Sequence, residues 1–425
     1  MPARRLPVRP NLDQLKHQAK DLLREIRQEN PGALADLQQF HPQPPEPARA
    51  KLADAQLTLA RSYQAPSWPR LVLACKLIDA IWRDHADAVR ELVVKHPELL
   101  HQQALVRLDS NWGPPLSYAA NLGRDRIITM LHQLGATDLM HALDRAVLQS
   151  RIGTARMLHR MLGSPTPPPG ALGSPAYTLS ASGTALLFEL GAPMVDENGE
   201  RYAPVDVVLQ SDSRKPDAKH QILEMYVQHG LDLPDTPMMA LHRGRIDLLE
   251  AHLQRDPDLL RRTFSYEAIF PPELRCGAED LPRTTLAGAT LLHACVEFDE
   301  LEIARWLLER GMSADVPAAK DADGFGGHTA LFGAVVCYAN FWMNYTGGWA
   351  PNRKPMDSPW ARLLWDHGAD PNARASLREQ VWTEGRRSIR EHRNLTPLAW
   401  GKVFHNQMVV SEPAMRLIAE RGGGA

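Results

Sequence analysis

Apolar residues recur at helical spacing along most of this chain, and the pattern is clearest between residues 288 and 315. An apolar run that begins at Leu291 is broken at Asp299, and a second run starts at Leu301. Charged residues fall on the opposite side of this second run, which makes it amphipathic. The stretch predicts two short antiparallel helices, with Thr290 as N-cap of the first and Gly311 closing the second at positive φ.

The same register appears at two further places. Pro115 and Leu116 open one unit and Gly135 closes it, and the 21-residue step from Pro114 to Gly135 equals that from Thr290 to Gly311. Towards the C-terminus, these positions are occupied by Thr329, Gly368, Thr396 and Pro397. Repetition at a constant register predicts an array of helical pairs.

These residues resemble the ankyrin repeat, whose pattern is Thr-Pro-Leu-His, two small residues, a Leu-Leu pair and a Gly-Ala-Asp exit. Thr290, His293 and Gly311 occupy motif positions, while Leu291 replaces the proline. The resemblance covers residues 71 to 425 and implies an all-α ankyrin-repeat solenoid of eight or nine repeats in a bacterial protein. It also implies a concave surface, lined by hairpin loops and first helices, where partners dock.

Residues 1–70 precede the repeats and read as a helical segment with a proline-rich linker at 41–47. Amphipathic spacing predicts a helix over 11–28, another helix follows from 50 to 63, and Ser67 can cap a helix beginning near Pro69. A solenoid needs a polar-faced cap over its first repeat, so we expect this segment to cover that end and to bury Trp68. A docking element of its own is the alternative.

Three long insertions interrupt the repeats, at 262–287, 335–358 and 374–393. Loops of this length are uncommon unless they are functional or disordered. The third is basic and polar apart from Trp382, a composition typical of a mobile segment. The second is rich in aromatic residues, which argues against disorder. Its candidate partner-binding residues are Tyr338, Phe341, Trp342, Tyr345, Trp349 and Arg353.

Two interpretations of the aromatic insertion stay open. Its rings can form a recognition platform, because Trp and Tyr concentrate in binding hot spots. They can equally pack on their own repeat as a satellite core. Under either interpretation, the ankyrin resemblance implies a non-catalytic role in protein–protein interaction through the concave face and loops of the solenoid, with an unidentified protein as partner.

Composition narrows the classes of partner. Lys and Arg number 48 against 50 Asp and Glu, a net charge of −2, which gives no general attraction to nucleic acid or anionic lipid. The four cysteines are scattered, and no apolar run is long enough for a signal peptide or membrane span. We therefore expect a cytoplasmic monomer.

Few residues suggest catalytic chemistry. His293 and Cys295 are candidates for a base and nucleophile, but two residues apart on a helix they point to different faces, which favours structural roles. No metal-ligand spacing or cofactor fingerprint appears, and the glycines around Phe325 suit a turn better than a phosphate loop. The alternative function is an enzyme or small-ligand-binding protein with a site under the second insertion, using His328, Asp366 or His367. An immunity or antitoxin-like accessory role is a third alternative.

Overall fold

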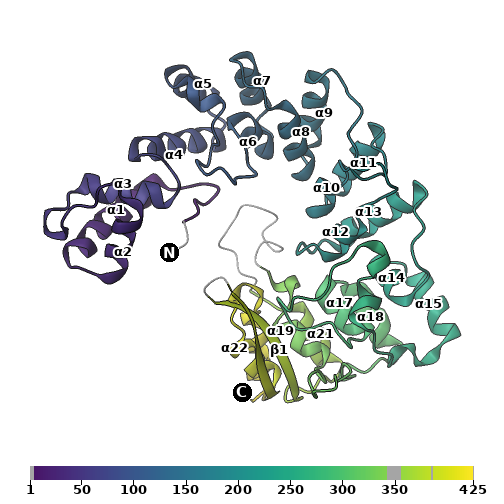
Figure 1. The fold of residues 1–425 in the computed structure, drawn as a ribbon. Coiled ribbons are helices and arrows are strands. Elements are labelled where there is room, and N and C mark those ends of the chain that lie inside the picture. The colour runs from purple at the N-terminus through teal and green to yellow at the C-terminus, as the bar shows by residue number, and fades with distance from the viewer. Residues whose placement is uncertain (1–3, 342–355, 384–385, 425) are drawn as a thin grey trace. The chain divides into compact units, whose positions relative to one another are not determined.

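The computed structural model describes residues 4–341, 356–383 and 386–424, which form paired helices and one two-stranded sheet (Figure 1). The chain divides into two compact units, residues 1–167 and 168–425. The division expected at residue 70, between cap and array, stays a prediction.

Three helices open the first unit: α1 (Leu12–Arg27), α2 (Pro31–Phe40) and α3 (Leu52–Ser62), with the short η1 (Pro47–Arg49) before α3. Asn11 and Asn30 cap the first two helices by accepting hydrogen bonds from backbone N–H groups of the first turn. One face of α1 is buried and packs on α2, α3 and the helix that follows them. The N-terminal helices therefore share a core with the first repeat.

The segment before α1 is also tied to the repeats of this unit. Tyr118 donates a hydrogen bond from its hydroxyl to the Val8 carbonyl and accepts one from Trp82 Nε1 at 2.7 Å. The Arg9 guanidinium lies 5.4 Å from the Trp82 ring centroid. Trp68, for which the sequence predicts burial, is instead partly exposed at the start of its helix.

Helix pairs of the first unit follow the expected register, with the short η2 (Pro97–Leu100) between the first and second pair. Pro115 occupies the first turn of α6, Leu116 is buried, and Gly135 has φ 105° after α7. The pairs are α4 (Trp68–Trp82) with α5 (Ala86–Lys95), α6 (Pro115–Leu122) with α7 (Asp125–Gln133), and α8 (Leu139–Leu148) with α9 (Ile152–Met161).

The second unit contains six helix pairs among its described residues. The first three are α10 (Gly173–Tyr177) with α11 (Ala181–Glu189), α12 (Val205–Gln210) with α13 (Pro216–Gln228), and α14 (Pro237–His242) with α15 (Ile246–Arg255), followed by η3 (Pro257–Leu260). The last three are α17 (Leu291–Phe298) with α18 (Leu301–Glu309), α19 (Ala330–Val335) with α21 (Pro359–Asp366), and α22 (Pro397–Val403) with α23 (Glu412–Glu420). The short η5 (Tyr338–Asn340) follows α19, and η6 (Gln407–Val409) lies between α22 and α23.

The first insertion, 262–287, has structure of its own. It contains α16 (Tyr266–Ile269) and η4 (Pro272–Leu274). Ile269 is buried, and its carbonyl accepts a hydrogen bond of 2.9 Å from His242 Nε2. This insertion therefore contributes to the core of the second unit.

The third insertion, 374–393, is a β-hairpin, so the expectation of a mobile segment is wrong. Strand β1 (Ala375–Thr383) pairs antiparallel with β2 (Arg386–Leu395), and β2 lies beside α22 (Figure 1). Leu377, Glu379 and Val381 alternate along β1 and are buried. This spacing of two is the signature of a strand, but the charged residue at its centre breaks the apolar pattern.

Candidate functional site

The motif residues of the seventh repeat form a buried hydrogen-bond network. His293 accepts a hydrogen bond at Nδ1 from the Thr290 backbone N–H, 3.2 Å away, and Thr290 Oγ1 lies 2.8 Å from the same nitrogen. The other ring nitrogen, Nε2, donates to the His328 carbonyl at 2.9 Å. Burial lowers the pKa of His293 to about 4, so the ring is neutral at pH 7. His293 thus joins its own helix cap to the next repeat.

Cys295 is fully buried, and burial raises the pKa of its thiol well above the usual range. A thiol held protonated inside a helix pair is a poor nucleophile. The geometry therefore supports a packing role for Cys295.

The eighth repeat departs from this network, because Phe332 occupies the position that His293 has in the seventh repeat. Thr329 precedes α19 without a side-chain capping bond, and its buried Oγ1 has no hydrogen-bond partner among the described residues. His328 Nε2 instead donates to the Thr285 carbonyl at 3.0 Å. In the eighth repeat, a hydrogen bond from His328 to the first insertion therefore replaces the contact between threonine and histidine that caps the seventh repeat.

Two candidate partner-binding residues, Tyr338 and Phe341, are described, and both are half-buried. Trp342, Tyr345, Trp349 and Arg353 lie outside the described residues. The Tyr338 ring has the guanidinium of Arg214 5.3 Å from its centroid and that of Arg283 at 5.4 Å. Burial raises the pKa of Tyr338 to about 12, so its hydroxyl stays protonated at neutral pH.

The two arginines share a buried carboxylate beneath Tyr338. Glu297 on α17 forms ion pairs with Arg214 and with Arg283, the latter at 2.7 Å from Nε to Oε1. The Glu297 carboxylate also accepts a hydrogen bond of 3.3 Å from the Tyr338 backbone N–H. Buried charges persist in proteins when they are paired in this way. The cluster anchors the start of the second insertion to the repeat core.

A pocket of about 260 Å³ opens beside this cluster. Its polar lining comes from Gln210, Arg214, Tyr266, Asp280, Arg283 and Tyr338. The sequence pattern offered no signal for Arg214 or Arg283, because their common partner Glu297 is 83 residues from Arg214.

A second cluster involves the long loop between α18 and α19, residues 310–329, which we call the finger. Asp321 Oδ1 accepts backbone hydrogen bonds from Asp323 at 3.0 Å and from Phe325 at 2.8 Å, which closes a tight turn at the tip. Gly326 has φ 113°, and a Cβ at this position would lie 2.1 Å from the Ala319 carbonyl oxygen. The glycines around Phe325 therefore shape a turn, as expected.

The finger is fixed against the β-hairpin. Gly326 donates a backbone hydrogen bond of 2.7 Å to Ser376. The Phe325 ring lies between two guanidinium groups, with the carbon of Arg378 at 3.8 Å and that of Arg393 at 4.2 Å from its centroid. Stacking of this kind suits the planar arginine side chain.

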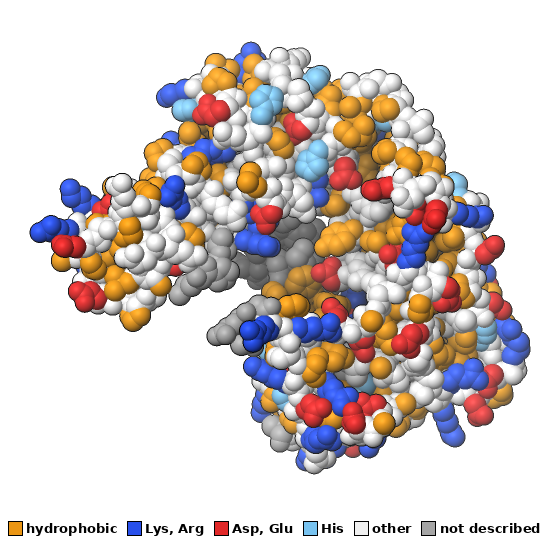
Figure 2. Space-filling view, viewed as in Figure 1, with side chains coloured by type: hydrophobic (Ala, Val, Ile, Leu, Met, Phe, Trp, Pro, Cys, Tyr) orange, Lys and Arg blue, Asp and Glu red, His pale blue; other side chains and the backbone are white. Residues whose placement is uncertain are grey.

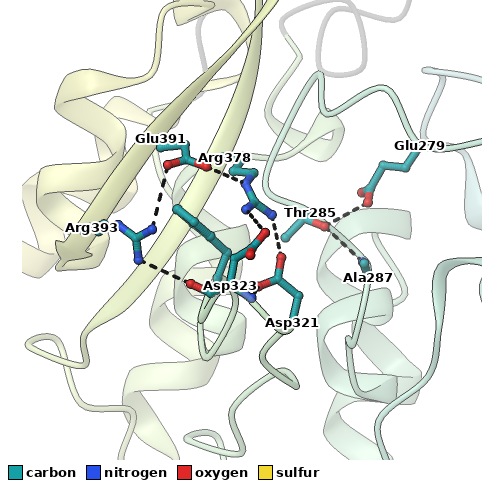
Figure 3. Close-up of polar contacts among 9 residues, drawn as sticks. Glu279, Thr285, Ala287, Asp321, Asp323, Arg378, Glu391 and Arg393 are labelled. Atoms are coloured by element: carbon teal, nitrogen blue, oxygen red, sulfur yellow. Dashed lines mark hydrogen bonds and ion pairs between the residues drawn. The ribbon is translucent and has the colours of Figure 1, made fainter.

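Arg378 is the centre of the ion pairs at this junction (Figure 3). Its guanidinium contacts Asp321 at 2.5 Å, Asp323 at 2.8 Å and Glu391 at 3.1 Å. Such a network holds an exposed loop in one conformation better than a single surface pair does. The fingertip is therefore ordered, although residues 319–324 are exposed.

Between finger, hairpin and first insertion lies a pocket of about 340 Å³. Glu279 contributes a carboxylate that accepts hydrogen bonds of 2.9 Å from Thr285 Oγ1 and from the Leu286 backbone N–H (Figure 3 shows the former). Burial raises the pKa of Glu279 above its usual value. Lys320 and Arg378 lie at the same pocket, so it presents groups of both charges.

The residues of the enzymatic alternative occupy different environments. His328 is fully buried, and its ring bonds to the Thr285 carbonyl. Asp366 and His367 are exposed at the end of α21, where His367 Nδ1 bonds to the Leu363 carbonyl at 2.9 Å. In the described part of the chain, no hydrogen bond or ion pair joins His328 to either of them.

The described residues offer no metal site. Over 4–341, 356–383 and 386–424, no group of three or more His, Cys, Asp or Glu side chains is placed to hold a metal ion. No described helix is long and apolar enough to cross a membrane.

The repeat geometry agrees with the comparison to known proteins. A family model described as an ankyrin repeat matches residues 287–322, which span α17, α18 and most of the finger. The fold is an all-α ankyrin-repeat array. Ankyrin repeats generally bind other proteins, which supports a binding role for this chain.

Two solved structures are similar to the chain. The human ASB11 ankyrin repeat domain has 15% identity and a TM-score of 0.25, over 73% of this chain and 99% of that domain. The ankyrin repeat domain of Bcl-3, a unique member of the IkappaB protein family, has 16% identity and a TM-score of 0.20, over 72% of this chain and 97% of that domain. No curated protein matches the chain.

Proposed function

We propose that this chain is a non-catalytic module that binds another protein. It would do so through the loops that connect its repeats, the finger among them, and through the first helices of the repeats. The observation that carries the proposal is the finger of the seventh repeat. Its tip is exposed at residues 319–324, yet hydrogen bonds to Asp321 and ion pairs to Arg378 order it. A loop that is already ordered loses little conformational entropy when a partner docks, so its contacts contribute more fully to affinity.

The start of the second insertion is a further part of the proposed interface. Tyr338 is half-buried and fixed by Arg214 and Arg283, so any segment that follows it leaves the repeat from a fixed point. Tyr and Arg are both enriched among residues that dominate binding energy. The aromatic residues from Trp342 to Trp349 are included in the proposal on sequence grounds alone.

The buried chemistry supports binding over catalysis. His293 is neutral and engaged at both nitrogens, while Cys295 is buried and protonated. A general base or nucleophile must reach a substrate, and neither side chain is exposed.

The test compares two variants that add the same side chain at different places. Ala322→Arg places a long charged side chain on the exposed fingertip, and Ala53→Arg places one on the exposed surface of α3 as the matched control. Wild type and both variants are immobilised, exposed to native lysate and analysed by quantitative mass spectrometry. We expect one or more proteins to be recovered with wild type and Ala53→Arg and depleted with Ala322→Arg.

Binding of the recovered protein to purified chain is then measured directly. A dissociation constant raised about tenfold or more by Ala322→Arg alone, as expected for a bulky change inside an interface, would support the finger as the docking site. Equal affinity for all three proteins, or no recovery above bare resin, would overturn the proposal.

A further inference from the structure

The β-hairpin formed by the third insertion has a free edge. β2 pairs with β1 along one side, and within the described residues the backbone of 386–393 makes no other backbone hydrogen bond. Nearly all of β2 is exposed. A strand edge of this kind presents unpaired N–H and C=O groups to which an added strand can bind.

The hairpin carries an excess of positive charge. Residues 374–393 contain six arginines and three glutamates, in a chain whose net charge is −2. The arginines near the finger, Arg378 and Arg393, are engaged with acidic groups or with Phe325. Within the described residues, Arg386 and Arg387 form no ion pair, and Arg390 reaches Glu379 only at 4.0 Å. Among the described residues of the hairpin, the positive charge is therefore least compensated at Arg386 and Arg387, at the start of β2.

Two apolar side chains accompany these arginines. The register places Trp382 opposite Arg387 and Gln380 opposite Ile389, so Trp382, Arg387 and Ile389 belong to one face. Trp382 is 66% exposed and Ile389 46% exposed, so this face presents two large apolar side chains to solvent. In Figure 2, blue side chains gather over the part of the molecule where Figure 1 draws the two strands.

The opposite face of the hairpin packs inward only near His392 and Glu379, whereas Arg386 and Arg390, which the register places on the same face, are exposed. His392 contacts the Trp400 ring of α22, with ring centroids 5.7 Å apart, and Glu379 is buried. At the other end of the open face, the finger fixes Arg378 and Glu391. The hairpin is therefore held on both faces at the end that carries Arg378, Glu379 and His392, and the edge near Arg386 to Arg390 is left open.

From these observations we infer that β2 binds an acidic segment of another protein in extended conformation, added as a third strand along its free edge. Backbone hydrogen bonds would supply affinity, Arg386, Arg387 and Arg390 would select carboxylates, and Trp382 with Ile389 would accept an apolar side chain. Charged residues on an edge strand can also serve only to prevent aggregation. That role requires neither an exposed tryptophan nor selection of acidic peptides, so binding experiments separate the two.

The probe is a fluorescent seven-residue peptide that alternates Glu with Val and Leu, titrated against the full chain. Two control peptides accompany it, one with Lys in place of Glu and one with Pro at the central position. We expect the acidic peptide to bind, the Lys peptide not to bind, and the Pro peptide to bind about tenfold more weakly or worse, because proline cannot donate the backbone hydrogen bond. Equal affinity of the acidic and Pro peptides would overturn strand addition.

Two variants of the hairpin test whether the acidic peptide binds there. The double change Arg386→Glu with Arg387→Glu should weaken binding of the acidic peptide about tenfold or more, as charge reversal at a rim does. Arg160→Glu with Arg261→Glu, at two other exposed arginines, is the charge-matched control and should bind like wild type. Trp382→Ser is a second, uncharged test and should also weaken binding. Unchanged affinity in both hairpin variants would overturn the assignment.

Two further measurements distinguish the hairpin edge from the finger and peptide binding from nucleic-acid binding. The fingertip variant Ala322→Arg should bind the acidic peptide normally, so a failure of the proposed finger interface leaves this inference standing. An oligothymidine of similar length is titrated in parallel, because arginine and tryptophan also suit single-stranded nucleic acid. Tighter binding of the oligonucleotide than of the acidic peptide would overturn the inference.

Discussion

Glu379 accepts two hydrogen bonds from one residue, His405: the backbone N–H donates at 3.0 Å and ring Nδ1 at 2.7 Å. His392 Nε2 lies 3.1 Å from the other carboxylate oxygen. The carboxylate therefore links the hairpin to the segment after α22. Burial raises the pKa of Glu379, but the hydrogen bonds from His405 and His392 outweigh it and hold the pKa below its usual value.

Glu379→Gln should lower the free energy of unfolding by about 1–3 kcal/mol, because the donors of His405 and His392 lose a charged acceptor that is itself buried. Glu391→Gln, on the adjacent strand, changes an exposed pair and should cost less than about 1 kcal/mol. Denaturant midpoints of both variants give the comparison. Since the folded pKa is lowered, the stability from Glu379 is present above its unfolded pKa and is lost as pH falls through the folded pKa. Equal midpoints for the two variants would show that the buried link contributes little.

Local sequence patterns are sufficient to predict the helix pairs. Ser67 and Thr396 accept hydrogen bonds from Arg70 and Ala399 in the first turns of α4 and α22, at residues where the pattern predicts capping. These features depend on neighbours three to four residues apart, which a single sequence displays.

The hairpin and the ion clusters could not be predicted in this way. Glu379 sits at a buried strand position because His405, 26 residues away, supplies its hydrogen bonds. Glu297 is similarly compensated by Arg214, which comes 83 residues earlier. In the sequence, a buried charge is indistinguishable from a surface residue until its distant partner is known. Glu379 therefore hides the alternation of buried residues along β1, and only the spacing of Leu377 and Val381 indicates a strand.

The neutral state of His293 predicts a dependence of stability on pH. Its folded pKa of about 4 lies below the usual 6.5, so the unfolded chain binds more protons between these values. Stability should therefore be full above pH 6.5 and fall on acidification towards pH 4, by up to about 3 kcal/mol from this residue. His293→Gln removes the titrating ring and should flatten this slope. His367→Gln, at an exposed histidine, should leave it unchanged, and urea titrations at several pH values measure both.

Three threonines at helix starts differ in what their side chains contact. Thr290 and Thr396 take part in capping, whereas Thr329 Oγ1 has no hydrogen-bond partner among the described residues. Thr290→Ala and Thr396→Ala should each lower the free energy of unfolding by about 1 kcal/mol. Thr329→Ala loses no hydrogen bond seen in the structure, so its denaturant midpoint should stay at the wild-type value. A larger loss at Thr329 than at the other two would contradict the proposed register.

The N-terminal helices should behave as a cap. Deleting residues 1–64 removes α1 to α3 and uncovers apolar surface on α4 that they contact. We expect a lower unfolding midpoint, increased binding of a hydrophobic dye and aggregation at concentrations that the full chain tolerates. A milder variant, Tyr118→Phe, loses the hydrogen bonds to Val8 and Trp82 and should cost about 1 kcal/mol. A truncated chain as stable and soluble as the full chain would make the segment an independent appendage.

The aromatic insertion offers the last prediction, which separates a recognition platform from a satellite core. If it is a platform, Trp342→Ala and Trp349→Ala should each weaken binding of the captured partner by about 2 kcal/mol or more and change stability little. If it is a satellite core, both changes should lower the unfolding midpoint first. Tyr338→Ala is the internal reference, because its ring contacts the guanidinium groups of Arg214 and Arg283 and its loss should reduce stability. A stability loss above about 3 kcal/mol for either tryptophan, as for removal of a buried one, would exclude the platform.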